Sequence, residues 1–141
     1  MKKRVVITGE GSISPLGHNS KSFWENLING KSGIDYISSF DTEKFSIKIA
    51  GEVKDFDSNH FFEAKDARKL DRFTMFGLIA ADQALQNSNY KSSEAGVIVG
   101  TGVGGMHTFE EEHQKLINKG QRGVSPFYVP KMIPNIAGGQ I

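Results

Sequence analysis

The segment Ala95–Gly105, with the sequence AGVIVGTGVGG, decides the fold of this chain. Its β-branched run Val97–Val99 predicts a short strand that is buried on both faces. Four glycines follow within six residues, and glycine is favoured where the backbone needs a positive φ or where another segment packs directly against it. The next residues, Met106–Asn118, predict a helix, because glutamates lie in its first turn and Gly120 follows its end. The chain is therefore organised around a strand, a glycine turn and a helix.

Three of these glycines also fit a nucleotide-binding fingerprint. Gly100, Gly102 and Gly105 have the G-x-G-x-x-G spacing, and they lie between an expected strand and an expected helix. A dinucleotide-binding domain also needs an acidic residue about 20 residues further on, at the end of a second strand, to hold the ribose. The corresponding segment, Lys119–Pro126, contains neither an acidic residue nor a strand pattern. Close packing of the turn is therefore the favoured explanation, and a nucleotide-binding α/β domain is the less favoured alternative.

The composition excludes several classes of function. The 141 residues include 17 Lys or Arg and 16 Asp or Glu, so the net charge of +1 provides no global field for nucleic acid. The absence of cysteine rules out disulfides, a thiolate nucleophile and cysteine-ligated metals within these residues. No apolar run reaches the ~20 residues of a membrane span, and the N-terminus lacks a signal-peptide core. We therefore expect a cytoplasmic protein without a nucleic-acid or membrane partner, and we assign it no cofactor and no metal.

The remaining segments predict an α/β protein with a mixed sheet. Strand patterns occur at Val5–Gly9 and Ile47–Val53. Helix patterns occur after Asn19 and Ser20, either of which can cap the helix, and at Asp71–Asn87. The segment Lys31–Lys44 is expected to be mostly loop. This alternation of strands and helices is typical of the α/β class.

The long helix expected at Asp71–Asn87 is apolar nearly all round, so it should lie inside the protein. Only three candidate strands are available to cover it. The tail after Ser125 contains three prolines and predicts short helical turns. Burial alone therefore indicates that residues 1–141 form the front part of a larger domain.

Eight short motifs occur in order along the whole chain. They are Arg4–Gly9, Ser14–Gly17, Gly30–Ile34, Phe40–Thr42, Ala50–Phe56, Arg68–Phe73, Gly100–Gly105 and Ser125–Pro130. Together they resemble the N-terminal part of the β-ketoacyl-acyl-carrier-protein synthase II family, the elongating condensing enzymes of fatty-acid synthesis. Glu10 departs from the pattern, because the family usually has an apolar or small residue between the two neighbouring glycines.

The resemblance implies a thiolase-like fold with α-β-α-β-α layers that works as a homodimer, of which residues 1–141 are the N-terminal part. In the family, a cysteine takes the acyl chain from its carrier-protein thioester, and two histidines assist the decarboxylation of malonyl-carrier protein. All three lie beyond the position that matches Ile141, so we assign no catalytic residue here. We expect that this chain alone does not condense acyl and malonyl thioesters. A non-catalytic fragment that binds acyl carrier protein is the main alternative.

Four cations lie within eight residues, namely Lys65, Arg68, Lys69 and Arg72, at spacings that would form one face of a helix. A local basic face on a nearly neutral protein suits an acidic partner. The alternative is a solvated surface that is balanced by the nearby acids. The resemblance implies that Lys65, Arg68 and Lys69 contact the acidic acyl carrier protein.

The resemblance also implicates three apolar residues in an acyl-chain pocket. Phe109, near the start of the helix after the glycine turn, matches the position that gates this pocket. A bulky ring there would fill volume that a longer chain needs. Ile133 and Pro134 match a region near the dimer interface and the far end of the pocket. Ordinary packing is the alternative for all three residues.

Overall fold

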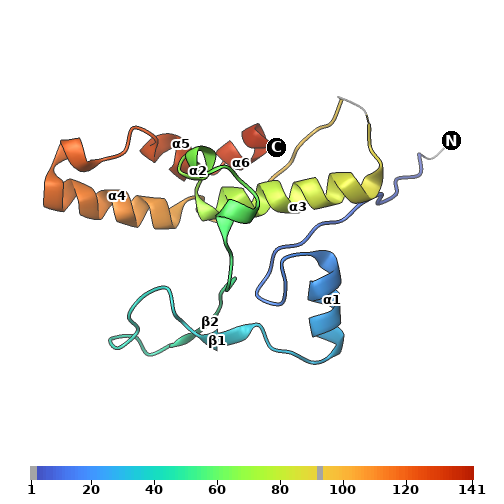
Figure 1. Cartoon of the computed structure of the whole chain (residues 1–141), viewed down its shortest axis with the longest axis horizontal. Coiled ribbons are helices and arrows are strands. Elements are labelled where there is room, and N and C mark those ends of the chain that lie inside the picture. The colour runs from blue at the N-terminus through green and yellow to red at the C-terminus, as the bar shows by residue number, and fades with distance from the viewer. Residues whose placement is uncertain (1–2, 92–93) are drawn as a thin grey trace. The chain divides into compact units, whose positions relative to one another are not determined.

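The structure, a computed structural model, describes residues 3–91 and 94–141 (Figure 1). The chain forms two compact units, which we describe separately. The first comprises Met1–Phe56 and Ala80–Tyr90, and the second comprises Asp57–Ile79 and Lys91–Ile141. The long helix α3 (Arg72–Ser88) contributes residues to both units.

Helix α1 (Ser20–Ile28) belongs to the first unit. Of the two predicted caps, Asn19 is the one that caps this helix, because its side-chain oxygen accepts a hydrogen bond from the Ser22 amide at 2.8 Å. The Asn26 side chain donates to the Leu16 carbonyl at 2.6 Å. The helix is therefore tied to the loop that precedes it.

A two-stranded antiparallel sheet completes the first unit. Strand β1 (Ile34–Tyr36) pairs with strand β2 (Ile49–Gly51), with Asp35 opposite Ala50 (Figure 1). β2 lies inside a segment that was predicted to be a strand, whereas β1 lies in a segment that we expected to be loop. A run of three residues with an aspartate in the middle is too short to show a strand periodicity.

Side chains from the end of α3 hold the N-terminal loop of the first unit. Gln83 accepts a hydrogen bond from the Ser12 amide at 3.0 Å and donates one to the His18 carbonyl at 2.8 Å. Asn87 donates to the Glu10 carbonyl at 2.9 Å. These bonds fix the loop that follows the first expected strand.

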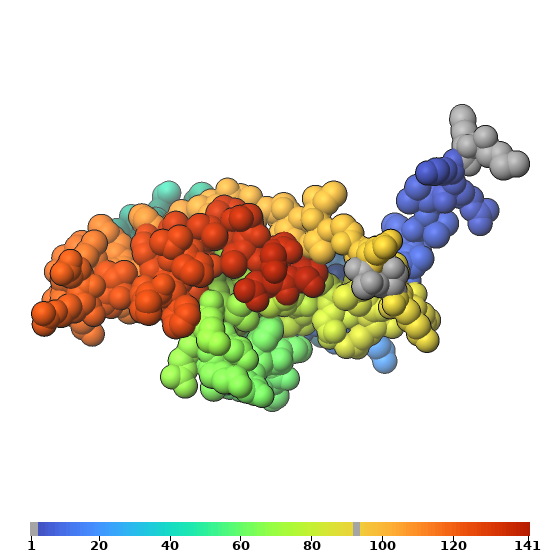
Figure 2. Space-filling view, turned by 90° about the horizontal axis from the view of Figure 1, so that it is seen from above, coloured from blue at the N-terminus to red at the C-terminus, as the bar shows by residue number. Residues whose placement is uncertain are grey.

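The second unit is helical. In chain order it contains the 3₁₀ turn Ser58–His60, α2 (Ala64–Ala67), the start of α3, α4 (Met106–Lys119), the 3₁₀ turn Gln121–Gly123, α5 (Tyr128–Met132) and α6 (Ile136–Gln140). α5 packs against α4, and Figure 2 shows the C-terminal segment in red beside the orange helix. The predicted helices over 71–87 and 106–118 and the helical turns of the tail are confirmed. The glutamates Glu110–Glu112 lie in the second turn of α4 and not in its first, because a turn has 3.6 residues.

The expectation that α3 is buried on all sides is wrong for the part of the chain that the structure describes. Of its apolar side chains, only Met75 and Ile79 are buried, and Leu85 is exposed. The small core of the second unit also includes Ala137, which approaches Gly77 of α3. The other apolar faces of α3 are not fully covered by the described residues.

Two predicted strands are not formed among residues 3–91 and 94–141. Val5–Gly9 and Val97–Val99 lie outside regular secondary structure, and Ile98 is 100% exposed. A strand needs a neighbouring strand to satisfy its backbone groups, and no described segment pairs with these runs. The α/β class is confirmed. We expected a mixed sheet, but the described residues form an antiparallel sheet of β1 and β2. None of the helices in these two ranges has the length and apolar character that crossing a membrane requires.

Candidate functional site

The glycine turn packs directly against the end of α5. Gly104 has a φ of 79°, which lies in the left-handed region that favours glycine. A Cβ on Gly104 would lie 2.5 Å from the Met132 carbonyl oxygen and 3.1 Å from the Pro134 nitrogen. The Gly105 amide donates to the same Met132 oxygen at 2.9 Å. These contacts support close packing as the role of Gly104 and Gly105, whereas a Cβ on Gly100 or Gly102 would meet no atom within 4 Å.

A buried carboxylate joins the starts of two helices in the second unit. Asp71, which is 5% exposed, precedes α3, and its Oδ1 accepts a hydrogen bond from the Phe73 amide at 3.1 Å. Its Oδ2 accepts from the Thr108 amide at 3.1 Å and from the Thr108 hydroxyl at 2.5 Å. Thr108 lies in the first turn of α4. Asp71 therefore satisfies backbone donors at both helix starts.

This carboxylate also bears on the nucleotide alternative. A phosphate bound at the N-terminus of α4 would need the free amides of the first turn. The Thr108 amide is already bonded to Asp71, and the Gly105 amide to Met132. A phosphate would also be repelled by the negative charge of Asp71. The geometry therefore disfavours a nucleotide at the glycine turn.

Phe109 lies on α4 and has two aromatic neighbours. Its side chain is 44% exposed, and its ring is parallel to that of His113, at an interplanar angle of 2° and a centroid distance of 6.1 Å. The ring of Tyr128, on α5, lies 6.5 Å away at a tilt of 38°. Phe109 is therefore bordered by aromatic rings from two helices.

The other two predicted pocket residues follow α5. Ile133 is half-buried and ends the helix, donating its amide to the Val129 carbonyl at 3.1 Å. Pro134 is exposed on one side and lies against Gly104. The Phe109 amide donates a hydrogen bond to the Gly105 carbonyl at 3.0 Å. The structure thus brings all three predicted pocket residues to the same glycine turn.

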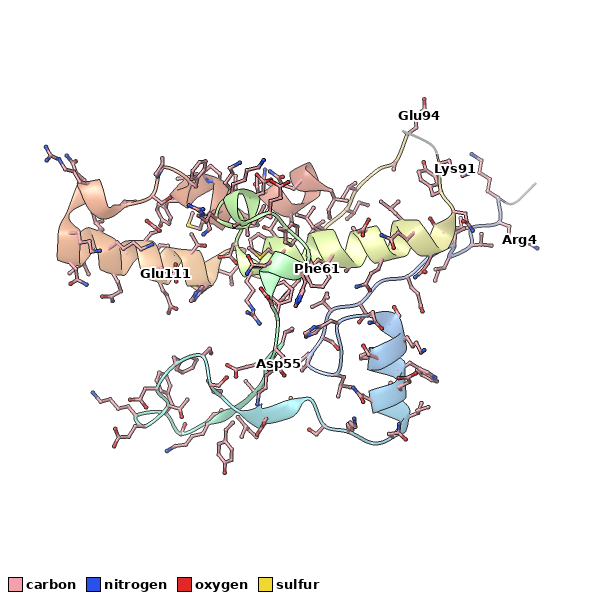
Figure 3. All side chains as sticks on the ribbon, viewed as in Figure 1. Arg4, Asp55, Phe61, Lys91, Glu94 and Glu111 are labelled. Atoms are coloured by element: carbon pink, nitrogen blue, oxygen red, sulfur yellow. The ribbon has the colours of Figure 1, made fainter. Side chains whose placement is uncertain are left out.

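Sequence reasoning missed a second buried carboxylate, Glu112 of α4, which is 4% exposed. It accepts hydrogen bonds from Lys115 Nζ at 2.7 Å and from the Ser125 amide at 2.6 Å. The bond from Lys115, and then that from Ser125, holds the pKa of Glu112 below its usual value. Its neighbour Glu111 lies on α4 (Figure 3), where its carboxylate is 3.2 Å from His107 Nε2 and 4.0 Å from Lys115 Nζ. Nothing in the sequence distinguishes these two glutamates.

The basic cluster, which we define as Lys65, Arg68 and Lys69, lies on α2 and on the turn after it. α2 ends at Ala67, and α3 begins at Arg72. Helical spacing therefore does not continue from Lys65 to Arg72. The prediction that four cations share one helical face is wrong, because the chain breaks the helix between them.

Both lysines of the basic cluster have an acidic neighbour. Lys65 Nζ lies 2.9 Å from Glu63, and Lys69 Nζ lies 2.8 Å from Asp66, where it lowers the pKa of that carboxyl. Arg68 differs, since its Nε donates to a carbonyl of α2 at 3.2 Å. Among the described residues, no carboxylate lies within ion-pair distance of its guanidinium. Arg68 can therefore bind a carboxylate of a partner protein without losing an ion pair within this chain.

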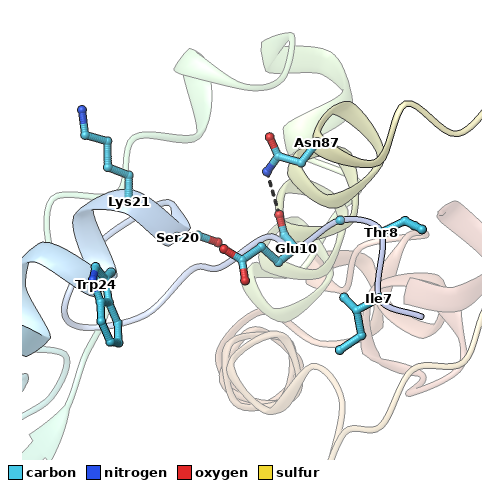
Figure 4. Close-up of a pocket in the computed structure, with 8 residues that line it drawn as sticks. Ile7, Thr8, Glu10, Ser20, Lys21, Trp24 and Asn87 are labelled. Carbon is cyan, nitrogen blue, oxygen red and sulfur yellow. Dashed lines mark hydrogen bonds between the residues drawn. The ribbon is translucent and has the colours of Figure 1, made fainter. Parts of the chain in front are cut away.

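A hollow of about 620 Å³ lies beside the N-terminal loop of the first unit (Figure 4). It is lined by residues 7–10, by Ser20, Lys21 and Trp24 of α1, and by Asn87 of α3. The hydrogen bond from Asn87 to the carbonyl at position 10 fixes one side of it. Sequence reasoning did not find this hollow, because its lining residues come from three separate segments.

The described parts of the chain contain no group of three or more His, Asp or Glu side chains placed to hold a metal ion. At the glycine turn the structure brings together its aromatic and apolar neighbours and the buried carboxylate of Asp71. The basic cluster lies in the same unit.

Comparisons with known proteins identify relatives over the whole chain. The 3-oxoacyl-(acyl-carrier-protein) synthase 2 of Staphylococcus aureus (strain COL) is 46% identical over 144 residues, which cover 99% of this chain and 35% of that protein. The protein of the same name from Vibrio cholerae serotype O1 (strain ATCC 39315 / El Tor Inaba N16961) is 46% identical over 145 residues, with the same two coverages. The chain thus spans about a third of the length of these curated relatives.

Solved structures show the same fold. A type II PKS acyl-carrier protein in complex with its ketosynthase bound to the hexaketide (AntDE:AntF, apo) matches with a TM-score of 0.76 and 26% identity, over 99% of this chain and 38% of that one. The ishigamide ketosynthase/chain length factor matches with a TM-score of 0.78 and 25% identity, over 94% and 34%. A beta-ketoacyl synthase from Burkholderia phymatum STM815 has a TM-score of 0.75 and 22% identity, over 98% and 36%, and supports the fold alone.

The family assignment comes from the sequence match. Residues 2–141 match the family described as beta-ketoacyl synthase, N-terminal domain. The match covers nearly the entire chain and agrees with the relatives and the fold described above. The chain therefore belongs to the beta-ketoacyl synthase family and carries its N-terminal domain.

Proposed function

We propose that this chain is the N-terminal segment of a β-ketoacyl-acyl-carrier-protein synthase, which condenses an acyl thioester with malonyl-carrier protein during fatty-acid elongation. The observation that carries the proposal is the 46% identity to 3-oxoacyl-(acyl-carrier-protein) synthase 2 over 99% of the chain. The similarity in fold to two ketosynthases supports the same class of reaction.

In this reaction a cysteine thiolate attacks the acyl thioester and displaces the carrier-protein thiolate. Malonyl-carrier protein then loses CO₂, and the resulting carbanion attacks the acyl-cysteine, which forms a carbon–carbon bond and releases the cysteine thiolate. The 141 residues contain no cysteine. The proposal therefore places the nucleophile, and two histidines that stabilise the enolate oxygen, in another part of the protein.

The test is condensation by the full-length protein, measured as β-ketoacyl product from an acyl donor and malonyl-carrier protein. We expect product from the full-length protein and none from residues 1–141 alone. Binding of carrier protein without product by the full-length protein would instead support a non-catalytic binding role. Product formed by residues 1–141 alone would contradict the assignment of the catalytic groups to another part of the protein.

We include the basic cluster in this proposal as a docking surface for acyl carrier protein. Lys65, Arg68 and Lys69 are exposed, and Arg68 has no acidic partner among the described residues. A carrier protein with acidic side chains would gain a charge-assisted bond to Arg68 and compete with the surface ion pairs of the two lysines. The solved complex of a ketosynthase with its acyl-carrier protein, which has a similar fold, supports a partner of this kind.

The docking proposal predicts that changing Lys65, Arg68 and Lys69 to Glu together weakens the Kd for acyl carrier protein by about tenfold or more at low salt. The loss should shrink as salt is added, because ions screen exposed charges. The matched control changes three other exposed lysines to Glu, namely Lys31, Lys44 and Lys48. Equal affinities in the two triple variants would count against the docking surface.

We also propose that Phe109, Ile133 and Pro134 border the acyl-chain pocket. Their position around one glycine turn supports this role, because a rigid turn holds apolar groups at fixed separations. Phe109→Ala should therefore raise the activity toward longer acyl donors relative to shorter ones. The matched control is Phe127→Ala, since Phe127 is 43% exposed in the same unit. An identical chain-length profile in Phe109→Ala and the unsubstituted protein would refute the role.

The proposal includes a homodimer, which the resemblance implies, and the cytoplasmic location that we expect from the sequence. Light scattering of the full-length protein tests the dimer, and a mass equal to one chain would contradict it.

A further inference from the structure

The two oxygens of Asp71 serve different helices. Oδ1 accepts the Phe73 amide at the start of α3, at 3.1 Å. Oδ2 accepts both the amide and the hydroxyl of Thr108, at 3.1 and 2.5 Å. Thr108 is held by two bonds to one charged group, and it is the residue immediately before Phe109.

These bonds lie in closely packed surroundings. Thr108 is 2% exposed, and Asp71 is similarly buried. Gly105 lies over the carboxylate, and a Cβ on Gly105 would be 2.9 Å from Oδ2. Hydrogen bonds to an ionised group are shorter and stronger than neutral ones, and exclusion of water strengthens them further. The first turn of α4 therefore has little freedom to rotate about the helix axis.

We propose that Asp71 is a positioning residue that, through Thr108, holds Phe109 in the orientation that limits the acyl chain. This inference rests on the proposed function, in which Phe109 borders the acyl pocket. Among the described residues, the ring of Phe109 has two ring neighbours, His113 on α4 and Tyr128 on α5, with centroids at 6.1 and 6.5 Å. The side chain of Phe109 starts from backbone that Asp71 anchors at Thr108, so a change in this anchor would move the ring relative to these two neighbours.

The test introduces 4-fluorophenylalanine at position 109 of the full-length protein. Thr108→Val keeps the size of the side chain but removes the hydroxyl that bonds to Asp71, whereas Thr108→Ser keeps the hydroxyl and is the matched control. Asp71→Asn keeps the shape of the acceptor but removes its charge. We expect the fluorine resonance to shift or split in Thr108→Val and Asp71→Asn, and to remain in place in Thr108→Ser.

Activity provides the second readout. The ratio of kcat/KM for long and short acyl donors should change by about threefold or more in Thr108→Val, in the same direction as in Phe109→Ala. A folded Thr108→Val protein with a lower melting temperature but an unchanged resonance and ratio would overturn the proposal, because Asp71 would then be structural only. If Thr108→Val does not fold, the fluorine resonance and the kcat/KM ratio of Asp71→Asn are compared with those of Thr108→Ser, and the same outcomes decide.

The two proposals fail in different ways. A full-length protein without condensing activity would refute the proposed function, yet the fluorine resonance would still show whether Asp71 orients the residue at position 109. An active protein whose fluorine resonance at position 109 is unchanged in Thr108→Val and in Asp71→Asn would refute only the positioning role.

Discussion

At Gly104 the backbone φ is 79°, and the carbonyl oxygen of Met132 lies 2.5 Å from the place that a Cβ would occupy. Only a residue without a side chain can adopt this conformation and make this contact at low cost. Gly102, two residues earlier, has open space around it, since a Cβ there would meet no atom within 4 Å. Two glycines of one motif therefore have different physical roles.

We expect Gly104→Ala to lower the free energy of unfolding by roughly 1–3 kcal/mol from the positive φ alone, with a further loss from the contact with Met132. Gly102→Ala is the matched control, and its effect should stay within about 0.5 kcal/mol. Chemical denaturation of the two full-length variants measures both values. Similar losses in the two variants would show that the contact with α5 is not the cause.

Glu112 provides a second prediction at the scale of one residue. Glu112→Ala removes a charged acceptor from the Ser125 amide and from Lys115, so we expect a loss of about 1.5–3 kcal/mol in the free energy of unfolding. The control is Glu110→Ala, an exposed position on the same helix. Amide exchange at Ser125 should rise in the first variant only, and unchanged exchange there would contradict the assigned bond.

Among the elements, the loop between β1 and β2 depends on one carboxylate. Glu52 accepts hydrogen bonds from the Ser39 amide at 3.1 Å and from the Ser38 amide and hydroxyl at 2.8 and 2.7 Å. The bonds from Ser39 and then Ser38 lower the pKa of Glu52 to about 2, from its ordinary value of 4.5. The charged form of Glu52 therefore stabilises this loop.

A pH dependence follows from this lowered pKa. Because the pKa of Glu52 is lower in the folded state, its contribution to stability is complete above about pH 4.5 and is lost as the pH falls toward about 2. The difference in unfolding free energy between the unsubstituted protein and Glu52→Gln should therefore shrink over that interval. Glu43→Gln, at an exposed position in the same loop, is the control. A difference that stays constant with pH would show that Glu52 does not titrate as described.

The elements also show which patterns in the sequence were informative. The helices α3 and α4 were predicted to within about two residues, and the beginning of α1 was predicted, because caps such as Asn19 and stops such as Gly120 are local signals. The strand pattern at Val97–Val99 was equally clear, but a strand forms only when a partner supplies hydrogen bonds. Strand prediction failed there because pairing is not a local property.

At the scale of the whole molecule, the candidate site was only partly predictable. The basic cluster was predicted from the spacing of its charges and Phe109 from the family resemblance, but the break between α2 and α3 could not be predicted from charge spacing. Asp71 and Thr108 are 37 residues apart in sequence. Their bond depends on how α3 and α4 begin in space, and an aspartate before a helix looks the same in sequence whether it is buried or exposed.

The exposed run at Val97–Val99 yields a prediction for the isolated 141-residue chain. An apolar segment with unpaired backbone groups promotes association between chains, and a charged side chain within the segment opposes it. We expect the isolated chain to self-associate, and Ile98→Lys to raise the concentration needed for association by about fivefold or more. Val103→Lys, at another exposed position, is the control. Sedimentation velocity measures the change, and equal association in both variants would exclude edge pairing through this run.

The shared carboxylate of Asp71 has a consequence for how the second unit loosens. Two helix beginnings that share one carboxylate are coupled, because a movement of Asp71 that releases the Thr108 amide also weakens its bond to the Phe73 amide at the start of α3. Local opening of the two helix ends should therefore occur together, as one cooperative event and not as two independent ones.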